Sequence, residues 1–265
     1  MDSDHCLVER DGHILTVTLN RPEAKNALSG GMMAGMYRAW RMLDEDSDLR
    51  VGILTGNGDV FCAGADLKAM GGGEQDSEFQ ELMAEVPDLH WQALLRHNRP
   101  LKPIIAAVEG FAVAGGTEIL QGTDIRIAAE NATFGVTEAR RGLFPLGGSS
   151  VRLRRQIPYT VAAEMLLTAR HISAQEALQF GLIGRTVPPG EAMAEARKVA
   201  GEICENGPVS IRALMKMLRE VDESYSESDA LVKELEYGGP VFASKDAREG
   251  PRAFAEKRKP RFTGE

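Results

Sequence analysis

The stretch VEGFAVAGGTE, residues 108–118, decides how this chain folds around a reaction centre. An apolar strand is predicted to end in it, two glycines follow, and a helix is predicted to begin beside Glu118. Small residues at such a junction let the backbone approach a ligand closely. Twenty residues later, Glu138 closes the stretch FGVTE, residues 134–138. If the fold brings Glu118 and Glu138 together, their carboxylates form an acid/base pair beside exposed backbone N–H groups.

The stretch FCAGADL, residues 61–67, repeats this pattern. A buried strand is predicted to end there, Gly64 permits a sharp turn, and Asp66 stands where an N-cap would start a helix. Backbone N–H groups at a helix start lack partners within the helix, so they can point at an oxyanion. Two such junctions facing each other would form an oxyanion hole. Tight packing of a strand against a helix is the alternative reason for the glycines.

The rest of the chain alternates short strands, tight turns and helices, which indicates an α/β fold without regular βαβ spacing. The predicted strands include a hairpin around Asp11-Gly12, buried strands at 51–55 and 103–109, a strand pair at 125–129 and 132–136, and a short strand within 182–187. Helices are predicted from near Ser29, at 160–169, after a capping box at 173–176, and at 191–206 and 209–224. We divide the chain into a core of residues 1–200 and a helical region of residues 201–265.

Composition narrows the classes of function. The 265 residues include 39 acidic and 31 basic side chains, and the resulting charge of −8 disfavours nucleic acid or an anionic membrane as partner. Residues 245–261 are locally basic, which fits either a solvated helix end or an anion site. Three widely spaced cysteines support neither a disulfide framework nor a zinc site, and no histidine spacing suggests a metal. Without an apolar signal segment or a membrane-length apolar run, we expect a cytoplasmic protein.

Six motifs in order carry a resemblance to a known family: PEAKNALS (22–29), FCAGADLKAM (61–70), VEGFAVAGGTE (108–118), FGVTEARRGLFP (134–145), GGSSVRL (147–153) and FAEKRKPRF (254–262). The chain resembles the crotonase family, also called the enoyl-CoA hydratase/isomerase family, over roughly residues 15–262. The resemblance implies an α/β spiral of ββα units with a C-terminal helical region used for trimerisation, in a homotrimer or a dimer of trimers.

The resemblance also implies a substrate and its binding residues. The substrate would be an acyl-CoA thioester whose carbonyl oxygen is held by the N–H groups of Ala65 and Gly115. Coenzyme A would be part of the substrate, with no separate cofactor and no metal. The positions that match the family's CoA contacts are Ala24, Lys25, Ala63, Asp66, Lys68, Phe254 and Lys257. The last two usually reach CoA from a neighbouring subunit.

The two glutamates match those of the family's hydratases. This predicts an enoyl-CoA hydratase in which Glu118 takes a proton from water and Glu138 gives a proton to C2. Leu146 stands where a glycine that helps to position the water is common, and Arg140 and Arg141 stand where aliphatic residues are usual. The alternatives are an enoyl-CoA isomerase or a non-catalytic acyl-CoA-binding subunit. Residues 71–96, read as a surface helix or a lid, leave a straight, branched or sterol-derived acyl group open.

Overall fold

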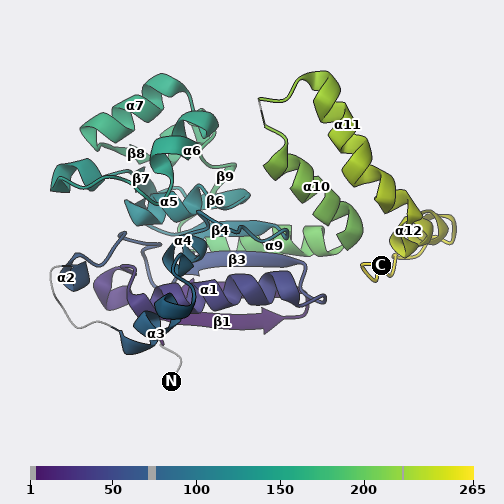
Figure 1. The fold of residues 1–265 in the computed structure, drawn as a ribbon, viewed down its shortest axis with the longest axis horizontal. Coiled ribbons are helices and arrows are strands. Elements are labelled where there is room, and N and C mark those ends of the chain that lie inside the picture. Colours follow the sequence, from purple (N-terminus) through teal and green to yellow (C-terminus); the bar gives the residue numbers. More distant parts are fainter. Residues whose placement is uncertain (1–3, 71–75, 223) are drawn as a thin grey trace.

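The computed structural model describes residues 4–70, 76–222 and 224–265 (Figure 1). The chain opens with β1 (Cys6–Asp11) and β2 (Ile14–Leu19), which pair antiparallel from Cys6–Leu19 to Asp11–Ile14. The predicted hairpin is therefore confirmed. Gly12 has φ +56° in the turn, a value that suits glycine.

A six-stranded sheet follows, in the order β1-β2-β3-β4-β6-β9. Beyond the hairpin every neighbouring pair is parallel, through β3 (Val51–Gly56), β4 (Ile104–Val108), β6 (Ile125–Ala129) and β9 (Arg185–Val187). All five residues of β4 are buried. Such continuous apolar runs are typical of parallel strands covered on both faces.

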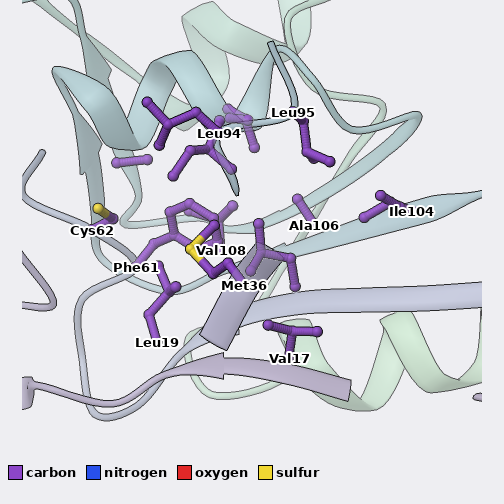
Figure 2. Packing of buried hydrophobic residues seen from close by; sticks show 14 of the residues in the cluster. Val17, Leu19, Met36, Phe61, Cys62, Leu94, Leu95, Ile104, Ala106 and Val108 are labelled. Atoms are coloured by element: carbon purple, nitrogen blue, oxygen red, sulfur yellow. The ribbon is translucent and has the colours of Figure 1, made fainter. Parts of the chain in front are cut away.

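Helices cover both faces of this sheet. The helix α1 (Gly30–Glu45) begins at Ser29, as predicted, and the Ser29 hydroxyl accepts a hydrogen bond from Met32 N–H at 3.2 Å. Its buried side chains join Val17, Phe61 and Val108 in the larger core cluster (Figure 2). The helix α9 (Ala192–Cys204) packs its small residues against the other face, in a second cluster with β3, β4 and β6.

A second, three-stranded sheet contains β5 (Phe111–Val113), β7 (Thr133–Gly135) and β8 (His171–Ser173). The predicted strands at 125–129 and 132–136 both form, but the prediction that they pair is wrong. Each of β4 and β6 is followed by a tight turn that carries the chain into the second sheet. Because the two units repeat this path side by side, β4 pairs with β6 and β5 pairs with β7.

The remaining helices lie around these sheets. Between the N-terminal hairpin and β9 these are η1 (Pro22–Ala24), α2 (Leu67–Met70), α3 (Ser77–Glu85), α4 (Leu89–Ala93), α5 (Gly115–Leu120), η2 (Glu138–Arg141), α6 (Ser149–Gln156), α7 (Tyr159–Thr168) and α8 (Ala174–Phe180). The capping box predicted at the start of α8 is present, and Gly181 ends this helix. Of the predicted surface helix or lid at residues 71–96, residues 71–75 lie outside the described residues.

The C-terminal helices form a separate group at one side of the molecule (Figure 1). They are α10 (Pro208–Glu220), α11 (Glu227–Gly238), η3 (Gly239–Ala243) and α12 (Lys245–Ala255). The division into residues 1–200 and 201–265 stays a prediction. Within the described parts of the chain, no helix is long and apolar enough to span a membrane.

Candidate active site

The two glycine junctions predicted from the sequence pack against each other. Cys62 N–H donates to Phe111 O at 3.1 Å, and Val113 N–H donates to Cys62 O at 3.0 Å. A methyl group on Gly116 would lie 2.5 Å from Cys62 O, so α5 can begin at this place only with glycine in its first turn. The glycines therefore set the packing of α5 and also bring its first turn up to residues 62–65.

This packing places the N–H groups of Ala65 and Gly115 side by side. A methyl group built on Gly115 would lie 3.6 Å from Ala65 N. Leu28 fixes the strand-like segment by donating to Gly64 O at 2.8 Å and accepting from Asp66 N–H at 3.2 Å, which leaves Ala65 N–H facing away from Leu28. Neither Ala65 N–H nor Gly115 N–H donates a hydrogen bond to another described residue. The pair can hold one oxygen atom.

Both N–H groups open into a cavity of about 620 Å³, here called the glutamate cavity. The predicted site residues Ala63, Ala65, Gly115, Glu118, Glu138 and Leu146 all line it. Its apolar wall consists of Leu28, Leu67, Trp91, Leu94, Val113, Leu143, Phe144 and Leu146. The cavity therefore combines two carboxyl groups and two N–H donors with a mainly apolar surface.

Glu118 is held rigidly at the back of this cavity. Glu118 is only 5% exposed. Its Oε1 atom accepts a hydrogen bond of 3.1 Å from the N–H group of Ser149, the first residue of α6. A methyl group on Gly147 would lie 2.6 Å from Oε2, so the loop backbone touches the carboxyl group directly. The pKa of Glu118 is raised to about 7: burial is the largest cause, Ser149 N–H opposes the rise, and the nearby charge of Glu138 adds to it.

Glu138 is the first residue of η2 and faces Glu118 across the same cavity. Burial raises its pKa, and backbone N–H groups of Thr137 and Glu138 oppose that shift. Its Oε2 atom is buried and has no hydrogen-bond partner among the described residues. A buried carboxyl oxygen without a protein partner is suited to bind a substrate or a water molecule. Two such groups share one cavity, so one of them favours the protonated form at neutral pH.

Three predicted CoA-binding residues, Ala24, Lys25 and Ala63, lie close together, and Ala63 lines the glutamate cavity. Ala63 N–H donates to Lys25 O at 3.0 Å, which ties residue 63 to the end of η1 at Ala24. The exposed Lys25 places Nζ 5.7 Å from the centre of the Phe111 ring. Backbone groups and an exposed ammonium are therefore available at one side of the cavity.

The other predicted CoA-binding residues have different settings. Asp66 forms an ion pair with Arg21 at 2.9 Å and accepts a hydrogen bond from Lys68 N–H at 3.0 Å, as an N-cap does. Lys68 is exposed. Phe254 is 87% exposed, and it and Lys257 stand at the end of α12, on the other side of the molecule from α2 (Figure 1). The structure does not bring these last two residues to the cavity of their own chain.

The sequence did not identify the support behind Glu118. Gln121, the C-cap residue of α5, donates through Nε2 to Ser149 Oγ at 2.6 Å, and Gln156 donates to Gln121 O at 3.0 Å. Ser149 begins α6 and follows the two glycines of the motif GGSSVRL, as expected of a helix start. Unpaired N–H groups at a helix start attract carboxylates, so this motif contained the signal for the contact of Ser149 with Glu118. His171, which no sequence pattern singled out, is also in the cavity wall.

Comparisons with known proteins agree with this arrangement. The family model described as enoyl-CoA hydratase/isomerase matches residues 9–265. Enoyl-CoA hydratase EchA19 of Mycobacterium tuberculosis is 53% identical over 256 residues, which cover 97% of this chain and 95% of that protein. Carnitinyl-CoA dehydratase of Salmonella typhi is 38% identical over 99% of both chains. The crystal structure of an enoyl-CoA hydratase from M. tuberculosis H37Rv matches with a TM-score of 0.90 at 40% identity, covering 99% of this chain and 100% of that chain.

The predicted α/β fold with its helical C-terminal region is thereby confirmed. The chain belongs to the enoyl-CoA hydratase/isomerase family.

Proposed function

We propose that this protein is an enoyl-CoA hydratase, which adds water across the C2=C3 double bond of a 2-enoyl-CoA thioester and forms a 3-hydroxyacyl-CoA. The reaction belongs to the β-oxidation of fatty acids or related acyl chains. One observation supports the proposal above all: Glu118 and Glu138, both with raised pKa, face one cavity beside the free N–H groups of Ala65 and Gly115.

Each group has a separate task in the addition. The N–H groups of Ala65 and Gly115 donate to the thioester carbonyl oxygen, where negative charge develops. Ionised Glu118 takes a proton from water while the water oxygen bonds to C3. The π electrons of the C2=C3 bond then move towards the carbonyl oxygen of the thioester. Protonated Glu138 then gives its proton to C2, which restores the carbonyl. Glu118 gains one proton and Glu138 loses one, and no electrons are transferred to or from the substrate. The addition therefore needs no cofactor beyond the CoA in the substrate.

Leu146 follows Pro145 in the loop between η2 and α6. It is 56% exposed and lines the cavity, while the next residue, Gly147, contacts Glu118. We infer that the backbone at Leu146 still helps to position the water and that its side chain lies along the acyl group. An isomerase needs no water, so hydration of 2-enoyl-CoA against double-bond migration in 3-enoyl-CoA distinguishes the two activities.

We infer that the molecule works as a homotrimer or a dimer of trimers in the cytoplasm. Exposed Phe254 and Lys257 would then reach the CoA bound to a neighbouring subunit, with Ala24, Lys25, Ala63, Asp66 and Lys68 contacting it from the subunit that holds the acyl group. Three free thiols, Cys6, Cys62 and Cys204, are compatible with a reducing compartment.

The test replaces each carboxyl group with an amide of the same shape. Glu118→Gln and Glu138→Gln should each reduce kcat by about 100- to 10,000-fold, because each removes one proton-transfer group. Affinity for a saturated acyl-CoA should change little, which also separates this enzyme from a non-catalytic acyl-CoA-binding subunit. Near-normal turnover in either variant, or no hydration by the wild type across acyl groups of graded size, would overturn the proposal.

A further inference from the structure

Two arginines stand in the wall of the glutamate cavity, directly after Glu138. Arg140 and Arg141 end the short helix η2, and both line the cavity. In a 3₁₀-helix residues three apart lie on the same side, and each residue rises about 2 Å along the axis. Arg141 therefore starts from the same side as Glu138, about 6 Å farther along the axis.

Neither arginine is used by the protein itself. Arg140 and Arg141 are exposed, and neither guanidinium group forms a hydrogen bond or an ion pair with another described residue. Arg170, beside β8, differs from these two arginines because it forms ion pairs with Glu164 at 3.2 Å and with Glu176 at 2.9 Å. Partial burial and the charge of Arg140 lower the pKa of His171, which places Arg140 near another cavity residue.

Apolar side chains line the cavity beside these two arginines. Leu143, Phe144 and Leu146 follow η2, line the same cavity and remain 41%, 65% and 56% exposed. Such side chains are suited to cover an apolar part of a ligand. A ligand that starts at Glu138 thus meets apolar surface together with two unpaired positive charges, in a chain whose formal charge is −8.

From this geometry we propose that the acyl group of the substrate carries a carboxylate at the end remote from the thioester, and that Arg140 and Arg141 bind it. The inference rests on the proposed function, because it names the substrate class of that reaction. Guanidinium groups bind carboxylates through two parallel charge-assisted hydrogen bonds. A neutral acyl chain of the same length would cover the two guanidinium groups without replacing their water.

Binding and turnover are measured separately to test it. The probes are two saturated acyl-CoA series of graded length, one ending in a methyl group and the other in a carboxylate. Calorimetry gives Kd for each pair with the wild type, Arg140→Gln, Arg141→Gln and the double variant. Arg140→Lys and Arg141→Lys test the bidentate geometry, and Arg154→Gln, an exposed arginine of α6 outside the cavity lining, is the matched control.

The wild type should bind the carboxylate member about tenfold more tightly at the best length, as expected for a charge-assisted hydrogen bond. The double variant should lose this ratio while its affinity for the methyl member stays the same, and Arg154→Gln should keep the ratio. Equal affinities in the wild type, or a ratio that survives in the double variant, would refute the inference. Equal weakening of both series would also refute it, because the arginines would then bind the CoA part.

Hydration of methyl-terminated 2-enoyl-CoA is assayed in parallel. Its absence would contradict the proposed function, whereas the ratio of Kd values judges the arginines without any turnover.

Discussion

At the scale of single residues, Glu118 combines burial with a need to ionise. Its pKa is raised to about 7, first by burial and then by Glu138, while Ser149 N–H favours the charged form. As the base on water, Glu118 must be ionised, so kcat/KM should fall as the pH drops through about 7. A pH profile of hydration measures this acid limb, which belongs to the coupled pair of carboxyl groups.

The same raised pKa predicts a conflict between stability and function. Between the unfolded pKa of 4.5 and the folded pKa of about 7, the folded protein holds the proton more tightly. The resulting stabilisation is present at pH values below 4.5 and is lost as the pH rises through 7. Ionising buried Glu118 therefore destabilises the fold at pH 8 by up to about 3 kcal/mol.

Glu118→Gln should consequently melt at a higher temperature than the wild type at pH 8, and the difference should shrink towards zero at pH 5. The amide oxygen still accepts from Ser149 N–H, so this contact is kept. Thermal unfolding followed by circular dichroism at both pH values measures the difference. Glu130→Gln, at an exposed glutamate, is the control and should show no such pH-dependent gain. A variant that is less stable than the wild type at pH 8 would contradict the expectation.

At the scale of elements, the two adjacent glycines at the start of α5 have different roles. Gly116 is needed for the fold, and Gly115 leaves room at the proposed oxyanion site. A methyl group on Gly116 would lie 2.5 Å from the backbone oxygen of Cys62, which cannot move without breaking the junction. A methyl group on Gly115 would meet Leu28 Cδ1 at 2.9 Å, the end of a flexible side chain, and would lie 3.6 Å from Ala65 N. The first substitution strains the fold, and the second fills the space between the two N–H donors.

Gly115→Ala should therefore remain folded and lose about 100- to 1000-fold in kcat, as after loss of an oxyanion-hole donor. Gly116→Ala should lower the melting temperature or prevent folding. Melting curves and kcat are measured for both variants, with Gly201→Ala in α9 as control because a methyl group there meets nothing within 4 Å. Full activity of Gly115→Ala would rule out the proposed oxyanion site.

Local sequence patterns predicted which residues form turns, strands and helix caps better than they predicted which strands pair. The hairpin at Asp11-Gly12 and the capping box of α8 depend on residues a few positions apart, so the sequence shows them directly. The pairing of β7 with β5 depends on how two distant units stack, which no local pattern contains. The same holds for the cavity. Glycines and glutamates predicted its centre, but only the tertiary fold brings Gln121, Trp91 and His171 to it or close to it.

At the scale of the whole molecule, the C-terminal helices leave several large apolar side chains exposed. Leu214 and Leu218 lie four residues apart on α10, as Leu231 and Leu235 do on α11, so each pair shares one helix face. Leu218 is 76% exposed and Leu235 is 74% exposed. Phe242 and Phe254 add exposed aromatic rings. Large apolar side chains exposed together on neighbouring helices favour a protein interface, and the proposed trimer would cover them.

Replacing Leu218 and Leu235 together with glutamine should break that assembly. Light scattering after gel filtration should give three or six times the chain mass of 28.8 kDa for the wild type and a smaller mass for the double variant. If Phe254 and Lys257 reach the CoA of a neighbouring subunit, KM should rise as the trimer dissociates. Leu167→Gln is the control, because Leu167 is 82% exposed on α7, away from the C-terminal helices (Figure 1). A wild-type protein that is monomeric and fully active would show that one chain completes the site alone.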